Sequence, residues 1–310
     1  MKKPVPKIYR TTNWSSYNRA LINRGNISIW FDPKSQWYAQ SQGKQGRNQT
    51  YSDTAIQCCL MIKSLFRLSL RMVTGFVQSL IKLCGLDWTA PDYSTLCRRQ
   101  KHIDIVINYQ KSSDGLHLLV DSTGLKFLGE GEWKRKKHGS EYRRQWRKLH
   151  IAIDAKTFQI RAVQLSTNNV GDSQVLGDLL DQIPPDERID SVYTDGAYDT
   201  RRCRQLIADR NAHAVIPPRK NVKPWKDKRA SSIERNALLD TVKRLGRTIW
   251  KKWSGYHRRS LVETKMHCIK LLGDKLIARS FPSLVNEIHA RMAVLNKFTE
   301  LGRPHTQVAP

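Results

Sequence analysis

The order of the predicted strands and helices between residues 116 and 216 limits the fold more than any other feature of this sequence. Three short apolar runs, at residues 116–121, 149–153 and 158–165, predict strands. The turn at 154–157 joins the second run to the third as in an antiparallel hairpin. A helix at 172–183, a strand at 189–194, a helix at 199–210 and a strand at 212–216 follow. This β-β-β-α-β-α-β order predicts a mixed α/β sheet covered by helices.

Two acidic residues stand at the ends of strands in this order. Asp121 closes the first predicted strand, and Asp195 follows the fourth. The order resembles that of ribonuclease H-like domains, in which the first and fourth strands are neighbours at the centre of the sheet. In such a domain Asp121 and Asp195 lie side by side, and a later helix packed across the sheet brings a third acid. Acids at strand ends are also common turn formers, so Asp114, Asp154 and Asp199 are rivals for these positions.

The stretch from residue 256 to residue 270 offers that third acid. If the stretch is helical, Tyr256, Arg259, Glu263 and Lys270 fall within an arc of about 60°. An apolar stripe turns away from this face and suits a helix packed on a core; it consists of Leu261, Val262, Met266, Ile269 and Leu272. The plain alternative is an exposed Arg259–Glu263 pair on a solvated face, which contributes only a few tenths of a kcal/mol.

The spacing of these four residues is Y-(2)-R-(3)-E-(6)-K. With this motif the chain resembles the DDE transposases of bacterial insertion sequences, a superfamily that includes the IS-four and IS-five families. Residues 91–97, 120–124 and 194–199 also resemble segments of the IS-five family, so the resemblance covers nearly the whole chain.

The resemblance implies which residues carry the chemistry. It makes Asp121, Asp195 and Glu263 the catalytic triad that binds two Mg²⁺ or Mn²⁺ ions, which prefer clustered carboxylate oxygens. It also implies that Tyr256, Arg259 and Lys270 hold DNA phosphates near the cleaved end. Arginine offers a bidentate fork for phosphate and lysine offers a point charge, so both suit this task.

The charge of the chain indicates a polyanionic partner. The sequence has 54 Lys and Arg against 27 Asp and Glu, which gives a net charge of +27. Because 39% of the residues are hydrophobic, a folded core can lie beneath this charge, and nucleic acid is the commonest partner of such a protein. A basic stripe near the first acid is predicted to follow DNA, although such runs are usually plain solvated surface; it comprises Lys126, residues 134–137, Arg143, Arg144, Arg147 and Lys148.

The predicted domains differ in composition. Residues 1–110 are mostly helical, and helices at 52–65, 69–83 and 94–100 suit a helix-turn-helix-like module that binds the transposon ends. Residues 111–300 form the ribonuclease H-like catalytic domain, with a basic insertion at about 217–254 and a tail at 301–310. The insertion is an irregular basic segment that is too long for an ordinary connection, so it is functional, disordered or a small insertion with its own structure. It contains Trp225, Trp250 and Trp253. We expect one of these side chains to stack on an unpaired base.

The sequence thus predicts a cytoplasmic, nucleoid-associated transposase. It is expected to bind the terminal inverted repeats, cleave at the ends and join the 3′ ends to double-stranded target DNA, as a homo-oligomer on DNA. No apolar run suits a signal peptide or a membrane span, and the six scattered cysteines argue against zinc sites and disulfides. The alternatives are a ribonuclease H-like nuclease without strand transfer and a domesticated DNA-binding regulator, against which an intact triad argues.

Overall fold

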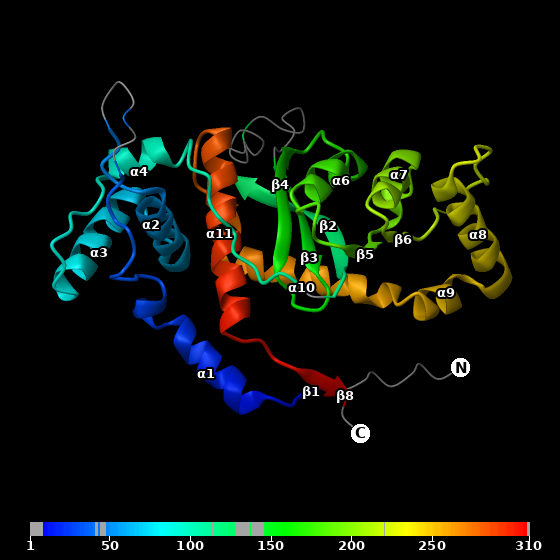
Figure 1. Cartoon of the computed structure of the whole chain (residues 1–310), viewed down its shortest axis with the longest axis horizontal. Coiled ribbons are helices and arrows are strands. Elements are labelled where there is room, and N and C mark those ends of the chain that lie inside the picture. The colour runs from blue at the N-terminus through cyan, green and yellow to red at the C-terminus, as the bar shows by residue number, and fades with distance from the viewer. Residues whose placement is uncertain are drawn as a thin grey trace. The chain divides into compact units, whose positions relative to one another are not determined.

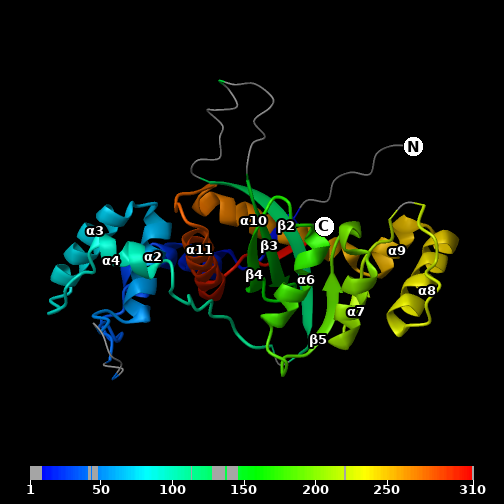
Figure 2. The same ribbon diagram turned by 90° about the horizontal axis from the view of Figure 1, so that it is seen from above.

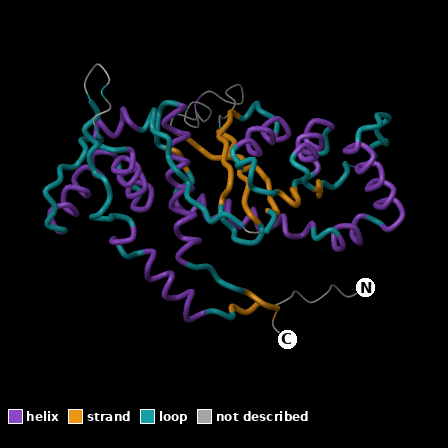
Figure 3. The backbone as a smooth tube through the Cα atoms, viewed as in Figure 1, coloured by secondary structure: helices purple, strands orange, loops and turns teal. Residues whose placement is uncertain are grey.

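The chain divides into two compact units. The computed structural model describes residues 9–40, 43, 48–112, 114–127, 137, 146–219 and 221–308 (Figure 1). The first unit, here the helical unit, comprises residues 1–108 and 293–310, and the second, here the sheet unit, comprises residues 109–292. The strands of the main sheet, orange in Figure 3, all belong to the second unit. No helix among the described residues is long and apolar enough to cross a bilayer.

The helical unit is built from short helices with well-formed ends. Its elements are β1 (Tyr9–Thr11), α1 (Trp14–Arg24), the 3-10 helix η1 (Ile27–Ile29), α2 (Asp53–Phe66), α3 (Leu70–Leu83), α4 (Tyr93–Arg99), the last turns of α11 (Phe281–Leu301) and β8 (Thr306–Val308). The side chains of Ser52 and Ser69 accept hydrogen bonds from backbone N–H groups at the starts of α2 and α3. Arg67, with φ at 52°, ends α2 in the left-handed conformation and leads into α3.

The C-terminal residues belong structurally to the helical unit. The ring of Phe298 packs edge-on against Trp30, with centroids 5.5 Å apart, and Arg24 donates to the carbonyl oxygen of Gly302 over 2.9 Å. Residues 306–308, which the sequence assigned to a tail, form β8 and pair antiparallel with β1. The side chain of Asn296 donates to the carbonyl oxygen of Asn108 over 3.0 Å. The two stretches of chain that make up this unit are therefore held together by side-chain contacts.

The sheet unit has the predicted mixed α/β order. Its elements are β2 (Leu116–Phe127), β3 (Arg147–Asp154), β4 (Ile160–Thr167), α6 (Asp172–Asp181), β5 (Ile189–Tyr193), η2 (Gly196–Tyr198), α7 (Arg201–Asp209), β6 (His213–Val215), α8 (Ala230–Leu245), α9 (Arg247–Trp253), η3 (Tyr256–Arg259), α10 (Ser260–Leu272), β7 (Lys275–Leu276) and the start of α11. The strands lie in the order β4-β3-β2-β5-β6, and β7 also pairs with β2. Neighbours β2, β3 and β4 are antiparallel, whereas β5 and β6 run parallel to β2.

Helices cover both faces of this sheet. Leu118 and Val120 of β2 are wholly buried in a core that they share with side chains of α6 and α7. Because side chains alternate along a strand, Leu119 and Asp121 point to the opposite face. Helix α10 contacts β2 there, and its Val262 and Ile269 are wholly buried. In Figure 2, α10 lies on the other side of the strands from α6 and α7.

Three elements differ from those expected. Strand β2 does not end at Asp121 but continues to Phe127, because β3 stays paired with it as far as Leu125. The stretch expected as one helix from residue 256 is a 3-10 turn followed by α10, which begins at Ser260. The basic insertion is not irregular throughout, since α8 and α9 lie within it and Gly246, with φ at 85°, separates them.

Candidate active site

The parallel pairing of β2 with β5 brings the first two acids to the same level. Leu119 is paired with Tyr193, so two residues further along each chain Asp121 stands level with Asp195. The backbone fixes one carboxylate oxygen of each: Asp121 accepts from the N–H of Ser122 over 2.9 Å, and Asp195 accepts from that of Ala197 over 2.8 Å. Burial raises the pKa of Asp121, and the negative charge of Asp195 raises it further. The two carboxylates are therefore electrostatic neighbours.

Arg259 connects the first acid to the third. Its guanidinium forms an ion pair with the carboxylate of Asp121 and donates to that of Glu263 over 3.0 Å. The expected i, i+4 pair is present, but the same guanidinium also reaches a strand 138 positions earlier in the chain. The side chains of Asp121 and Arg259 are 17% and 19% exposed, whereas Glu263 is 60% exposed. An exposed Arg259–Glu263 pair on a solvated helix face would explain the contact with Glu263 but not the contact with Asp121.

Tyr256 lies beside the same group. Its ring packs on Trp250, with centroids 5.8 Å apart, and the ammonium of Lys251 lies 5.2 Å from the ring centre. Burial raises the pKa of the Tyr256 hydroxyl, while the positive charge of Arg259 opposes that shift. Lys270 is exposed in the last turn of α10, about 10 Å along the helix axis from Glu263. The structure thus brings Tyr256, Arg259 and Glu263 together with the two aspartates, whereas Lys270 stands apart from them along α10.

Two residues of the predicted basic stripe contact other side chains of the protein. Lys126 is exposed on β2. Lys148 instead forms an ion pair with Asp172 over 2.9 Å, and the guanidinium of Arg147 lies 4.6 Å from the ring centre of Phe127. Both side chains therefore have partners within the protein. Residues 134–136, Arg143 and Arg144 lie outside the described residues.

The rival acids have structural partners. Asp154 is buried at the turn between β3 and β4, where it accepts from the backbone of Lys156 and Thr157 and from the Thr157 hydroxyl. Asp199 is buried between two arginines. Asp114 pairs with Lys156 at the surface. Each rival is accounted for as a turn former or a counter-ion, which leaves Asp121, within β2, and Asp195, just after β5, as the best-placed acids.

The sequence pattern did not single out two polar side chains near the acids, Asp172 and Tyr198. Asp172, the first residue of α6, accepts from the hydroxyl of Ser122 over 2.7 Å, next to Asp121. The buried hydroxyl of Tyr198 has no hydrogen-bond partner among the described residues. Burial raises its pKa, and the charges of Asp172, Asp121 and Asp195 add to the shift. The segment 194–199, singled out by its resemblance, contained Tyr198 and was the signal that could have found it.

The donor set suits a hard divalent cation, although it is not assembled as a ready metal site. Among the described residues, no three His, Cys, Asp or Glu side chains are grouped so that they could hold an ion. The position of Arg259 explains this, because its guanidinium occupies the space between the carboxylates of Asp121 and Glu263. Carboxylate oxygens are the ligands that Mg²⁺ and Mn²⁺ prefer, and release of Arg259 would free the carboxylates of Asp121 and Glu263.

Comparison with known protein families agrees with this geometry. Two family models, each described as a transposase DDE domain, match residues 22–130 and residues 112–297. The second match covers more than half of the chain. The chain belongs to the DDE transposase family. The sheet unit accordingly has the ribonuclease H-like fold that the order of its elements predicted. Transposases of this family act on DNA, which they cleave and transfer, and DDE domains generally use divalent metal ions.

The buried His150 of β3 generates a prediction about acid stability. Its Nε2 lies 2.9 Å from the hydroxyl of Ser166, and burial lowers its pKa to about 4. Between pH 6.5 and pH 4 the unfolded chain binds a proton at this site that the folded protein does not, so His150 makes stability fall as the pH drops. Wild type should lose roughly 2 kcal/mol more unfolding free energy between pH 7 and pH 4.5 than His150→Gln, measured by urea titration. The same loss in both proteins would contradict this assignment.

Proposed function

We propose that this protein is a transposase of the IS-five family that cleaves DNA at the ends of an insertion sequence and joins the 3′ ends to target DNA. The observation that carries the proposal is the level placement of Asp121 and Asp195 on adjacent strands, with Glu263 linked to Asp121 through Arg259. The spacing of Tyr256, Arg259, Glu263 and Lys270 supports the assignment to this family within the DDE transposases.

In this proposal Asp121, Asp195 and Glu263 hold the divalent ions. When bound, two Mg²⁺ or Mn²⁺ ions stabilise the charge on the attacking and leaving oxygens of a phosphodiester. The protein contributes orientation, because the backbone N–H groups of Ser122 and Ala197 fix one oxygen of each aspartate. Glu263 is the most exposed of the three and stands on a separate element, α10, so its position depends on the packing of that helix on β2.

Basic residues around the acids hold the DNA strand. Arg259 is placed to exchange its two carboxylate partners for phosphate oxygens, which fit the same guanidinium fork. The exposed Lys126 and Lys270 add further point charges. Arg147 and Lys148 contribute to the positive field beside the site while they keep their partners within the protein.

Neutral replacements of the three acids test the triad. Asp121→Asn, Asp195→Asn and Glu263→Gln keep the side-chain size but remove the charge that a divalent ion needs, so each should abolish end cleavage and joining in Mg²⁺. Binding to end DNA should persist, since phosphate contacts supply most of the affinity and the acids oppose them. Asp181→Asn, at an exposed acid in the last turn of α6, is the matched control and should be neutral.

The outcomes separate the candidate functions. Joining at the wild-type rate by Asp121→Asn or Glu263→Gln would remove the proposed site. Cleavage by wild type without any joining of pre-cut ends would favour the nuclease alternative. End binding without cleavage or joining under all metal conditions would favour the regulator.

The position of Arg259 predicts how metal binding responds to its loss. Without DNA, Arg259→Gln should bind Mn²⁺ several-fold more tightly than wild type, because a partly exposed ion pair of up to about 1 kcal/mol no longer competes for the carboxylates. Joining should nevertheless fall, since the phosphate contact is lost. Lys270→Gln, which touches neither acid, should leave Mn²⁺ binding unchanged. Electron paramagnetic resonance of free Mn²⁺ measures both affinities, and equal affinity of Arg259→Gln and wild type would contradict the competition.

We further propose that the helical unit recognises the transposon ends. Its α2 and α3, joined by a tight turn at Arg67, and the following α4 resemble a helix-turn-helix arrangement. Because residues 293–310 belong to this unit, the testable piece is residues 1–108 joined to 293–310 by a short glycine linker, which the Asn108–Asn296 contact makes possible. The linked fragment should bind an end duplex more tightly than random DNA, and its affinity should fall steeply as the salt concentration rises. Equal affinity for both duplexes at every salt concentration would refute the proposal.

Of the three tryptophans of the insertion, we propose Trp253 as the one that stacks on an unpaired base. Trp250 is buried and Trp225 lies against the guanidinium of Arg235, whereas Trp253 is 78% exposed at the end of α9. A base stacked on an aromatic ring contributes about 1–3 kcal/mol, so Trp253→Ala should weaken strand cleavage about tenfold or more. Trp253→Phe keeps a ring and should retain much of the activity. Full activity of Trp253→Ala in a cleavage and joining assay would leave the insertion without this role.

A further inference from the structure

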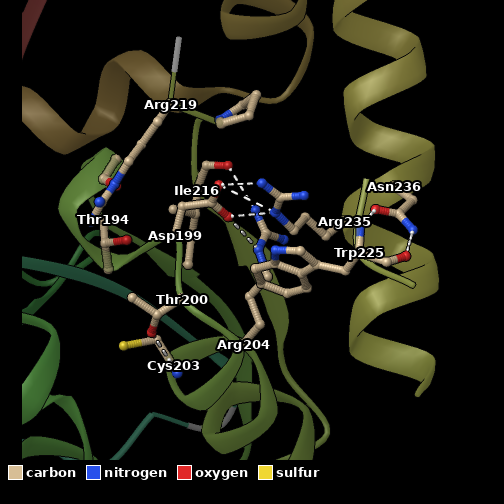
Figure 4. Close-up of polar contacts among 12 residues, drawn as sticks. Thr194, Asp199, Thr200, Cys203, Arg204, Ile216, Arg219, Trp225, Arg235 and Asn236 are labelled. Atoms are coloured by element: carbon tan, nitrogen blue, oxygen red, sulfur yellow. Dashed lines mark hydrogen bonds and ion pairs between the residues drawn. The ribbon is translucent and has the colours of Figure 1, made fainter. Parts of the chain in front are cut away.

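A buried ion cluster lies at the base of the basic insertion. The carboxylate of Asp199, between η2 and α7, accepts from Nε of Arg204 over 2.8 Å and from Nε and Nη2 of Arg235, each over 3.1 Å. Arg204 belongs to α7, and Arg235 belongs to α8 of the insertion. The three side chains are at most 2% exposed. Figure 4 shows both guanidinium groups turned toward the one carboxylate.

The same cluster organises the chain that leads into α8. Arg235 donates to the carbonyl oxygen of Lys223 over 3.2 Å, and its guanidinium lies 4.1 Å from the ring centre of Trp225. The side chain of Asn236, the next residue, accepts from the N–H of Trp225 over 2.9 Å and donates to the carbonyl oxygen of Trp225 over 2.8 Å. The segment before α8 is therefore fixed by α8 itself through two consecutive side chains.

Further contacts reach the loop that carries Asp195. Arg219, at the start of the insertion, donates to the carbonyl oxygens of Gly196 and Ala197 over 2.8 and 2.9 Å. Arg204 also donates to the carbonyl oxygen of Ile216, which lies just before the insertion (Figure 4). Asp199 itself stands four residues after Asp195. One carboxylate thus connects the second acid's loop, helix α7 and the insertion.

The charges of this cluster indicate a role besides stabilisation of the fold. One buried carboxylate faces two buried guanidinium groups, and burial lowers the pKa of Arg204. Removing ions from water costs several kcal/mol each, so well-packed apolar residues of similar size often stabilise a core as well or better. What apolar side chains do not provide is the fixed direction of hydrogen bonds to Ile216 and Lys223.

We propose that Asp199 is a positioning residue that fixes the α8–α9 insertion against the Asp195 loop. The exposed Lys243, Arg244 and Lys252 of the insertion then keep a constant placement relative to Asp195. The inference rests on the proposed function, because its consequence is that DNA held by these cations meets the metal-binding acids in a single geometry.

Measurements on unmodified protein give the first test. In hydrogen exchange, the amides of α8 should be protected to the same level as those of α7, since the buried cluster makes the two open together. Exchange of α8 at least a hundredfold faster than that of α7 would overturn the proposal. This readout is independent of catalysis, so a protein that fails to join DNA would count against the proposed function and not against the cluster.

Variants then separate positioning from stability. In Asp199→Asn, joining kcat should fall at least tenfold with little change in KM for end DNA, and trypsin should cut faster between residues 221 and 253. The apolar triple variant Asp199→Leu, Arg204→Met, Arg235→Met should melt near the wild-type temperature and show the same loss of kcat. Arg201→Gln removes an exposed ion pair of 3.2 Å with Asp227 that also joins α7 to the insertion, and it should behave as wild type. Wild-type kcat in a folded triple variant would overturn the proposal and leave the cluster a purely structural one.

Discussion

The ion pair between Arg259 and Asp121 is the interaction on which the candidate site depends. Pairing of β2 with β5 sets two carboxylates level with each other, and like charges at that position disfavour the ionised state. The guanidinium of Arg259 balances this charge and at the same time engages Glu263 of the following helix. Strand register, the 3-10 turn and α10 are therefore tied to one another through a single cation. A divalent metal ion bound by the same acids would have to replace that cation.

Replacement of Arg259 by a metal ion would distinguish the free protein from the protein bound to DNA. In the free protein the positive charge beside the acids comes from Arg259 on the short 3-10 turn η3, between Gly255 and α10. Gly255 has φ at 66°, a left-handed conformation that glycine adopts at little cost, and it leads α9 into this turn. Under the proposed function, a DNA phosphate would compete for Arg259 and a divalent ion would compete for the carboxylates, so each ligand would favour the binding of the other.

The sequence predicted the parts of the molecule that follow local periodicity. The strand order, the hairpin at 154–157 and the apolar stripe of α10 could all be recognised because apolar spacing reports burial. The helices of the insertion could not, since Leu239 is the one buried hydrophobic side chain of α8 and its periodicity is weak. The extension of β2 past Asp121 was missed because it depends on pairing with β3, a contact that local composition does not show. Arg204 and Arg235 gave no signal, because arginine is ordinarily a surface residue and only the fold places both beside Asp199.

The central claim is that Asp121, Asp195 and Glu263 bind the divalent ions together, and iron-directed cleavage tests it most directly. Fe²⁺ bound in place of Mg²⁺ generates hydroxyl radicals with ascorbate and peroxide, and these cut the backbone next to the ion. With end DNA present, cuts should appear at three places far apart in the sequence, close to residues 121, 195 and 263, and should disappear with excess Mg²⁺ and in the Asp121→Asn, Asp195→Asn double variant. Cuts concentrated elsewhere, or an unchanged pattern in the double variant, would contradict the account.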